Sequence, residues 1–252
     1  MKTLNTDKTW IGYGKKDPYF GVLFEEKYLD KNLSQDSLTD FFLSGRKYVD
    51  NLFEIIHNQV DQNFKPNTAL DFGCGTGRLI IPLAKRIEKV VGLDISKDIL
   101  EIARINSEKN NLNNIRLYLS DDNLSKITNQ KFDMINSYIV FQHLNVNRGE
   151  KLIQLLLKQL NSNGICSLHL TYFKDKPKLY KIIYFLRSRI PFLHSFLNVL
   201  RGKSFKTPLM QMNTYNLNRI FQIIQIEGIK KCHVDYTNHG GELGVQLIFQ
   251  KK

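Results

Sequence analysis

The sequence predicts an α/β fold in which helices cover a doubly wound, mostly parallel β-sheet. Short apolar runs with strand character alternate with longer segments whose apolar residues recur at helical spacing, from residue 68 to residue 172. A glycine-containing run at residues 73–77 falls where the first buried strand passes into a helix. A chain of 252 residues is also long enough to bury the core of such a domain.

Each expected element rests on its apolar pattern and its flanking residues. Strands are predicted at residues 68–72, 90–93, 115–119, 132–137 and 165–172, followed by a hairpin of 230–236 and 244–250. Helices are predicted at residues 34–60, 78–87, 97–108, 148–160 and 215–225. Ser96 is a suitable N-cap for the third of these helices, and Ser44-Gly45 could interrupt the first.

The glycine-containing turn predicts a ligand site. Glycines at positions 73, 75 and 77 let the backbone bend sharply and bring peptide N–H groups against a ligand with no Cβ in the way. Such a turn suits an anionic or polar group. Asp94 ends the next apolar strand, where its carboxylate could accept hydrogen bonds from both hydroxyls of a ribose.

The spacing of the glycines argues against two other nucleotide sites. A dinucleotide fingerprint needs glycine at its first, third and sixth positions, and the sixth position counted from Gly73 is Arg78. A Walker-type phosphate loop needs Gly-Lys-Ser or Gly-Lys-Thr at its end, whereas Gly77 is followed by Arg78 and Leu79. Hydrolysis of a nucleoside triphosphate is therefore not expected.

Four segments, in the same order, resemble the motifs of class I S-adenosylmethionine (SAM)-dependent methyltransferases. Residues 70–78 resemble the first motif of that family, 91–96 the second, 119–122 the third and 132–137 the fourth strand. The resemblance extends from about residue 69 to residue 170. It implies a Rossmann-like, seven-stranded, mostly parallel sheet with an antiparallel last strand, SAM as the cofactor, and methyl transfer as the reaction.

The resemblance also implies which residues bind SAM. Asp71 and the turn would line its methionine and ribose part, Asp94 would hold the ribose hydroxyls, and Ile95 would lie against adenine. Asp121 would accept a hydrogen bond from the adenine amino group, although Asp121-Asp122 could equally be a polar turn after a strand. The full expected set is Arg46, Asp71, Gly73, Cys74, Gly75, Thr76, Gly77, Asp94, Ile95, Asp121, Asp122 and Asn136.

Two members of this set could instead have no direct role in SAM binding. Arg46 lies on the helix before the first strand, where it could pair with the methionine carboxylate or be a solvated helix charge. Cys74 lies inside the turn, and packing is its expected role, because no activating base is close to it in the sequence.

Candidate catalytic residues follow the fourth strand. Methyl transfer from a sulfonium is an in-line displacement, so the protein mainly aligns the nucleophile with the methyl group. His143 could act as the base for an oxygen or amine acceptor, or it could be a structural histidine. Tyr138 could stack on or orient the acceptor. His239 and Glu242, in the last hairpin, form a second acid-base candidate or a polar turn.

The chain is expected to carry two additions to the methyltransferase domain, which we place at residues 63–252. Residues 1–62 form an N-terminal extension, with an aromatic flap at 1–33 followed by helices that pack on the core. Residues 174–212 are inserted after the fifth strand as two short basic amphipathic helices. We interpret this insertion as a substrate lid, and residues 180–200 could alternatively contact a membrane surface.

Composition limits the compartment and the cofactors. No apolar stretch is long enough to span a bilayer and the first residues are too polar for a secretory signal, so a cytoplasmic protein is expected. The three cysteines are scattered, which indicates neither a disulfide framework nor a zinc site. No metal is expected, since the acidic cluster of magnesium-dependent methyltransferases is missing.

The net charge of +12 favours an acidic partner but does not identify one. The basic residues are spread along the chain and form no recognisable RNA-binding module. We therefore expect a small-molecule or saccharide acceptor, methylated at oxygen or nitrogen. An RNA methyltransferase that binds through the basic lid, and a SAM-binding partner protein without turnover, are the alternatives.

Overall fold

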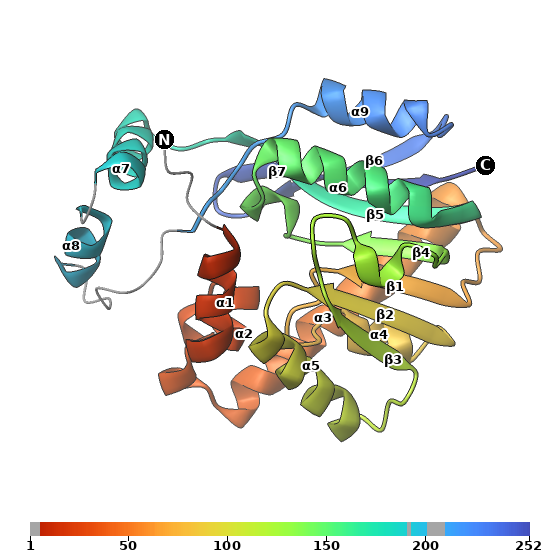
Figure 1. The fold of residues 1–252 in the computed structure, drawn as a ribbon, viewed down its shortest axis with the longest axis horizontal. Coiled ribbons are helices and arrows are strands. Elements are labelled where there is room, and N and C mark those ends of the chain that lie inside the picture. The colour runs from red at the N-terminus through yellow and green to blue at the C-terminus, as the bar shows by residue number, and fades with distance from the viewer. Residues whose placement is uncertain (1–5, 191–192, 201–209) are drawn as a thin grey trace.

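The computed structural model describes residues 6–190, 193–200 and 210–252. A single sheet of seven strands, in the order β3-β2-β1-β4-β5-β7-β6, forms its centre (Figure 1). The strands are β1 Thr68–Phe72, β2 Lys89–Asp94, β3 Ile115–Leu119, β4 Phe132–Ser137, β5 Leu160–Lys174, β6 Cys232–Asn238 and β7 Glu242–Gln250. β7 pairs antiparallel with both β5 and β6, whereas the pairs formed by β1 to β5 are parallel. The predicted fold class is confirmed.

Helices cover both faces of the sheet. They are α1 Thr6–Lys16, α2 Pro18–Val22, α3 Gln35–Ile55, α4 Ile80–Ala84, α5 Lys97–Lys109, α6 Val146–Gln159, α7 Lys178–Arg189, α8 Leu193–Leu200 and α9 Leu217–Ile226. Short 3-10 turns lie at Glu26–Tyr28, Asp30–Asn32, Ser125–Ile127 and Phe141–His143, and α3 continues into a π-helical turn at Ile56–Val60.

Side chains alternate between the two faces along each central strand, as a β-strand requires. On β1, Leu70 and Phe72 point into a core shared with α6 and α9, whereas Ala69 joins the opposite core with α3 and α4. Both faces of the parallel strands are therefore buried, which explains why these strands read as apolar runs in the sequence.

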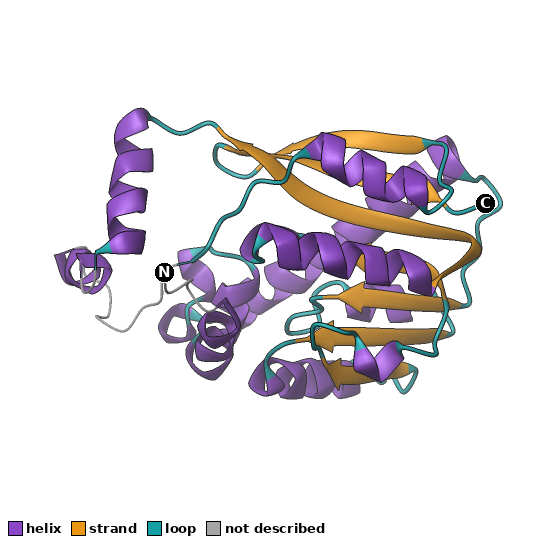
Figure 2. Cartoon of the chain, turned by 45° about the horizontal axis from the view of Figure 1, so that its top comes forward, coloured by secondary structure: helices purple, strands orange, loops and turns teal. Residues whose placement is uncertain are grey.

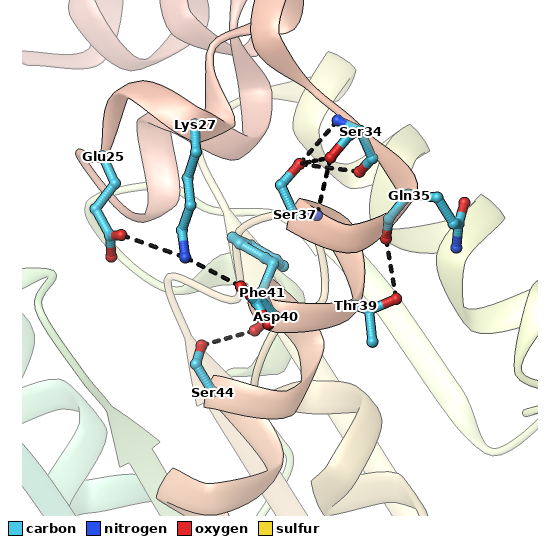
Figure 3. A network of polar contacts seen from close by, with 9 residues as sticks. All are labelled: Glu25, Lys27, Ser34, Gln35, Ser37, Thr39, Asp40, Phe41 and Ser44. Atoms are coloured by element: carbon cyan, nitrogen blue, oxygen red, sulfur yellow. Dashed lines mark hydrogen bonds and ion pairs between the residues drawn. The ribbon is translucent and has the colours of Figure 1, made fainter.

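The helix α3 runs without a break through Ser44-Gly45, contrary to the predicted interruption. Ser34 and Ser37 form a capping box at its start, where Ser34 Oγ accepts from the Ser37 amide at 3.1 Å (Figure 3). Gly45 is needed for close approach: a Cβ placed there would lie 2.0 Å from the carbonyl oxygen of Arg78. The helix therefore packs directly on the end of the glycine turn.

The additions to the domain also have defined structure. The expected flap is largely helical, with α1 and α2 packed around an aromatic cluster of Tyr13, Phe20, Tyr28 and Phe41. The two helices expected in residues 174–212 are present as α7 and α8, and residues 191–192 and 201–209 of that segment lie outside the described residues. The division of the chain at residue 62 and the action of α7 and α8 as a lid stay predictions.

Candidate active site

A cavity of about 640 Å³ lies at the carboxyl ends of β1 to β4. Its walls come from the turn after β1, the ends of β2 and β3, the loop after β4, and the N-terminal helices. In Figure 2 the arrowheads of the central strands point toward these helices. Ligands of doubly wound sheets bind at this edge, so the cavity has the position expected of an active site.

The glycine turn lines the cavity and can be made only by glycine. Gly73, Gly75 and Gly77 have φ values of 78°, 55° and 103°, in the left-handed region that other residues rarely adopt. A Cβ on Gly73 would lie 2.3 Å from the side chain of Val140, and one on Gly75 would lie 2.7 Å from Val22. The turn is thus fixed by its own conformation and by its neighbours.

Asp94 closes the turn from the end of β2. One carboxylate oxygen accepts from the Gly75 amide at 3.1 Å, and the other accepts from the Ser96 amide at 3.1 Å. Burial raises the pKa of this carboxyl, and the backbone donors that surround it oppose the rise. Asp94 and its neighbour Ile95 both line the cavity.

Asp121 and Asp122 have different surroundings. Asp121 lines the cavity and accepts from the amides of Asn123 and Ser125, which lower the pKa of its carboxyl. Asp122 turns outward and accepts from Arg148 at 2.6 Å, so it does not line the cavity. Arg148 also pairs with Asp7 on α1 at 2.6 Å and thereby ties the N-terminal helix over this end of the cavity.

Asp71 and Asn136 lie behind the cavity wall and do not line it. Asn136 donates to Asp71 at 2.9 Å and accepts from Tyr48 of α3 at 3.1 Å. The second Asp71 oxygen has no hydrogen-bond partner among the described residues. Burial raises the pKa of Asp71 to about 7. This network lies behind the glycine turn and supports it. Tyr48, its third member, was not among the predicted site residues.

Three other members of the expected set, Cys74, Thr76 and Gly77, differ in whether they line the cavity. Cys74 lines the cavity as a buried thiol whose pKa is raised by burial, which fits the packing role. Thr76 and Gly77 do not line the cavity. Thr76 is buried, and its hydroxyl lacks a hydrogen-bond partner within the part of the chain that the structure describes.

Arg78, not Arg46, is the arginine of the cavity. The Arg46 side chain is 74% exposed and lies 3.7 Å from Asp50, outside the cavity, because its position on α3 points it to solvent. Arg78 is 6% exposed and lines the cavity. Burial lowers its pKa, and its Nε has no hydrogen-bond partner in the described ranges. The sequence signal for this residue is its place directly after the third glycine.

His143 lines the cavity and is held on both ring nitrogens. Its Nδ1 donates to the carbonyl of Gln211 at 2.9 Å, which leaves Nε2 to accept from the Gln142 amide at 3.2 Å. Gln142 in turn accepts from Thr171 at 2.7 Å. Burial lowers the pKa of His143 to about 4, so the ring is neutral near pH 7. Trp10 of α1 packs edge-on against it, with ring centroids 4.8 Å apart.

Residues 210–215 are hydrogen-bonded to the same loop. Asn213 donates to the Leu144 carbonyl at 2.8 Å, and the Tyr215 hydroxyl donates to the Phe141 carbonyl at 3.0 Å. Met210 and Met212 add apolar surface to the cavity.

A ring cluster forms a further wall near Arg78. Tyr138 and His239 line the cavity, and His169 lies between them, with centroids 4.9 Å from Tyr138 and 5.1 Å from His239. The guanidinium of Arg78 lies 5.8 Å from the Tyr138 ring centroid. Glu242 is buried outside the cavity lining, so the structure does not bring it to the site with His239.

The geometry defines a Rossmann-like domain with a cavity at the carboxyl edge of its sheet. Comparisons with known proteins identify its family. Residues 64–219 match the family described as methyltransferase domain. Magnesium protoporphyrin IX methyltransferase from Synechocystis PCC 6803, solved with SAM, aligns over 100% of both chains with a TM-score of 0.64 and 16% identity. A SAM-dependent methyltransferase from Methanosarcina mazei aligns over 78% of this chain and 96% of its own, with a TM-score of 0.58 and 18% identity.

Curated relatives cover shorter stretches and have different acceptors. Ubiquinone biosynthesis O-methyltransferase of Pelagibacter ubique is 34% identical over 42% of this chain and 42% of its own. A 23S rRNA (uracil(1939)-C(5))-methyltransferase of Aliivibrio fischeri is 34% identical over 31% of this chain and 18% of its own. The chain spans less than half the length of these two relatives. It belongs to the class I SAM-dependent methyltransferases, and SAM is its cofactor.

Proposed function

We propose that this protein transfers the methyl group of SAM to an oxygen of a small, largely apolar acceptor. The observation that carries the proposal is the mixed lining of the cavity. It combines the polar side chains of Asp94, Ser120 and Asp121 with large apolar side chains. These are Trp10, Phe24, Leu144, Leu152, Met210 and Met212.

The polar side chains of the cavity suit the cofactor. Asp94 would accept from the ribose hydroxyls, Ile95 would pack on adenine, and Asp121 would accept from the adenine amino group. The methionine carboxylate would pair with Arg78, whose buried Nε otherwise has no partner among the described residues. SAM supplies an electrophilic methyl group, and these residues orient it and exclude water.

The apolar side chains of the cavity suit the acceptor. Pockets of a few hundred to 1,000 Å³ hold small ligands, and a cavity of about 640 Å³ is within that range. Burial of aromatic and thioether side chains favours an apolar acceptor body over a saccharide or a nucleic-acid backbone. The O-methyltransferase relative supports an oxygen acceptor, and the RNA methyltransferase relative provides the competing hypothesis.

The proposal is tested with methyl-labelled SAM and cell extract that has been separated into organic-soluble, polar small-molecule and RNA fractions. The purified chain is expected to transfer label to the organic-soluble fraction, and the Asp94→Ala variant serves as the control without cofactor. Label in the RNA fraction would establish the RNA alternative. Bound SAM without any labelled product would establish the partner-protein alternative.

We further expect His143→Ala to lower turnover about 100-fold while leaving SAM affinity within twofold of wild type. The acceptor hydroxyl would replace the Gln142 amide at Nε2 and pass its proton to the neutral ring. Because neutral imidazole is the competent form and its pKa is about 4, turnover should be constant from pH 6 to 8 and fall as the pH approaches 4.

Steady-state kinetics over this pH range measure both effects. His233→Ala is the matched control, since His233 lies on β6, pairs with Asp235 and does not line the cavity. Unchanged turnover in His143→Ala would show that the ring is structural, held by Gln211 and Gln142.

A further inference from the structure

The segment between β5 and α9 has an unusual charge distribution. No aspartate or glutamate occurs from Lys176 to Ile226, whereas nine lysines and arginines do. The whole chain has 36 basic and 24 acidic residues, so most of its net charge of +12 comes from this one stretch. A surface of one sign attracts a partner of the opposite sign.

The same segment exposes large apolar side chains. Of the fifteen strongly exposed large hydrophobic residues in the described part of the chain, eight lie between Phe173 and Leu200. Leu179 and Leu200 are 66% and 67% exposed. Scattered exposed apolar residues are ordinary, but a concentration of this kind marks an interaction surface.

The exposed residues are spaced to share helix faces. On α7 and just beyond it, Leu179, Leu186 and Ile190 are separated by seven and four positions, which places them along one stripe. On α8, Phe196, Val199 and Leu200 are separated by three and one positions and also share a face. Both views show α7 and α8 standing away from the sheet at one end of the molecule (Figures 1 and 2).

These helices are joined to the rim of the cavity. The Tyr184 hydroxyl of α7 donates to the carbonyl of Met210 at 3.3 Å, and Lys174, at the end of β5, donates to the carbonyl of Met212. Met210 and Met212 contribute apolar surface to the cavity. The exposed helices are therefore connected to residues that line the cavity.

We propose that α7 and α8 dock on the surface of an anionic phospholipid membrane. Neither helix carries an acidic residue, and α7 carries four lysines and arginines. Apolar stripes with flanking basic charge have the composition of helices that lie in the membrane interface. The basic residues of the segment complement anionic headgroups, and the exposed leucine, isoleucine and phenylalanine side chains enter the acyl boundary. Binding is peripheral, because no helix in the described ranges has the length and apolar character of a bilayer-spanning segment.

The test is flotation of the purified full chain with vesicles. Vesicles of phosphatidylcholine with about 30% phosphatidylglycerol are expected to carry the protein, and pure phosphatidylcholine vesicles to carry on the order of tenfold less. Binding should also weaken as salt is raised, because mobile ions screen the lysines and arginines from the lipid headgroups.

Two variants locate the contact. The triple change Leu179→Ser, Leu186→Ser and Ile190→Ser, and the double change Lys178→Glu and Lys181→Glu, should each lower vesicle binding by about tenfold or more. Matched controls are Ile105→Ser with Ile226→Ser and Tyr236→Ser, and Lys65→Glu with Lys126→Glu, which alter exposed residues elsewhere. SAM affinity, measured in parallel, should be unchanged in all four and reports that each chain is folded.

Three outcomes would overturn the proposal. The first is no vesicle binding by the wild-type chain, and the second is equal binding by the two variants and their controls. The third is that the same substitutions abolish binding to a bulk RNA sample or dissociate a dimer while vesicle binding is absent. None of these outcomes depends on the identity of the methyl acceptor.

Discussion

Asp94→Ala is expected to lower SAM affinity by about 100-fold to 1,000-fold. In the proposed site the carboxylate accepts two hydrogen bonds from the ribose, and a hydrogen bond to a charged group contributes about 1.5–3 kcal/mol. The substitution also removes the acceptor for the amides of Gly75 and Ser96, so the turn loses part of its support. Calorimetric titration of wild type and variant with SAM measures the difference.

Asp94→Asn is the informative companion, because it keeps one acceptor oxygen and nearly the same shape. Its loss of affinity should lie between those of wild type and Asp94→Ala. Thermal unfolding of each variant separates a folded protein with weak binding from an unfolded one. An Asp94→Ala affinity within threefold of wild type, or tighter uptake of NADH than of SAM by the wild-type chain, would contradict the placement of the ribose.

Gly45→Ala is expected to lower the free energy of unfolding by about 2–4 kcal/mol. The new Cβ would meet the Arg78 carbonyl at 2.0 Å, and neither α3 nor the turn can yield by moving a flexible side chain. Because the displaced backbone belongs to the turn, SAM affinity should fall as well. Denaturant unfolding measures the first effect, and titration with SAM measures the second.

Gly12→Ala is the matched control for this substitution. Gly12 is also helical, in α1, and a Cβ there would find no atom within 4 Å. It should therefore be neutral or stabilising by up to about 1 kcal/mol, as alanine usually is in a helix. Equal stability of Gly45→Ala and wild type would show that α3 and the turn can separate at little cost.

The central sheet could be predicted because its signals are local. The predicted strand 68–72 coincides with β1 and the predicted 132–137 with β4, since buried parallel strands are apolar runs with turn residues at their ends. The glycine turn could likewise be predicted, because a sharp bend after a strand needs backbone conformations that glycine adopts readily. The N-terminal helices lacked such a signal, because α1 contains two glycines and owes its stability to aromatic packing.

The site could be predicted best where a residue lies at or shortly after the carboxyl end of a strand. Gly73, Asp94, Asp121 and Tyr138 lie at the end of a strand or within two residues after it, and all line the cavity. Arg46 was predicted in place of Arg78, although Arg78 directly follows the third glycine, because which of them faces inward depends on how α3 packs on the turn. Trp10 and Arg148 line the cavity because segments distant in the sequence pack together. The local sequence pattern around each residue does not predict this.

The attachment of residues 210–215 to the loop around His143 has a mechanical consequence. Residues 210–215 follow α7 and α8 in the chain, and they are hydrogen-bonded to the loop that would receive the acceptor. A displacement of the outlying helices would therefore be passed to the loop around His143, to which Asn213 and Tyr215 are hydrogen-bonded. If α7 and α8 were bound to a membrane, they would fix the orientation of the cavity entrance relative to the membrane surface. A hydrophobic acceptor could then pass from the membrane into the cavity without crossing bulk water.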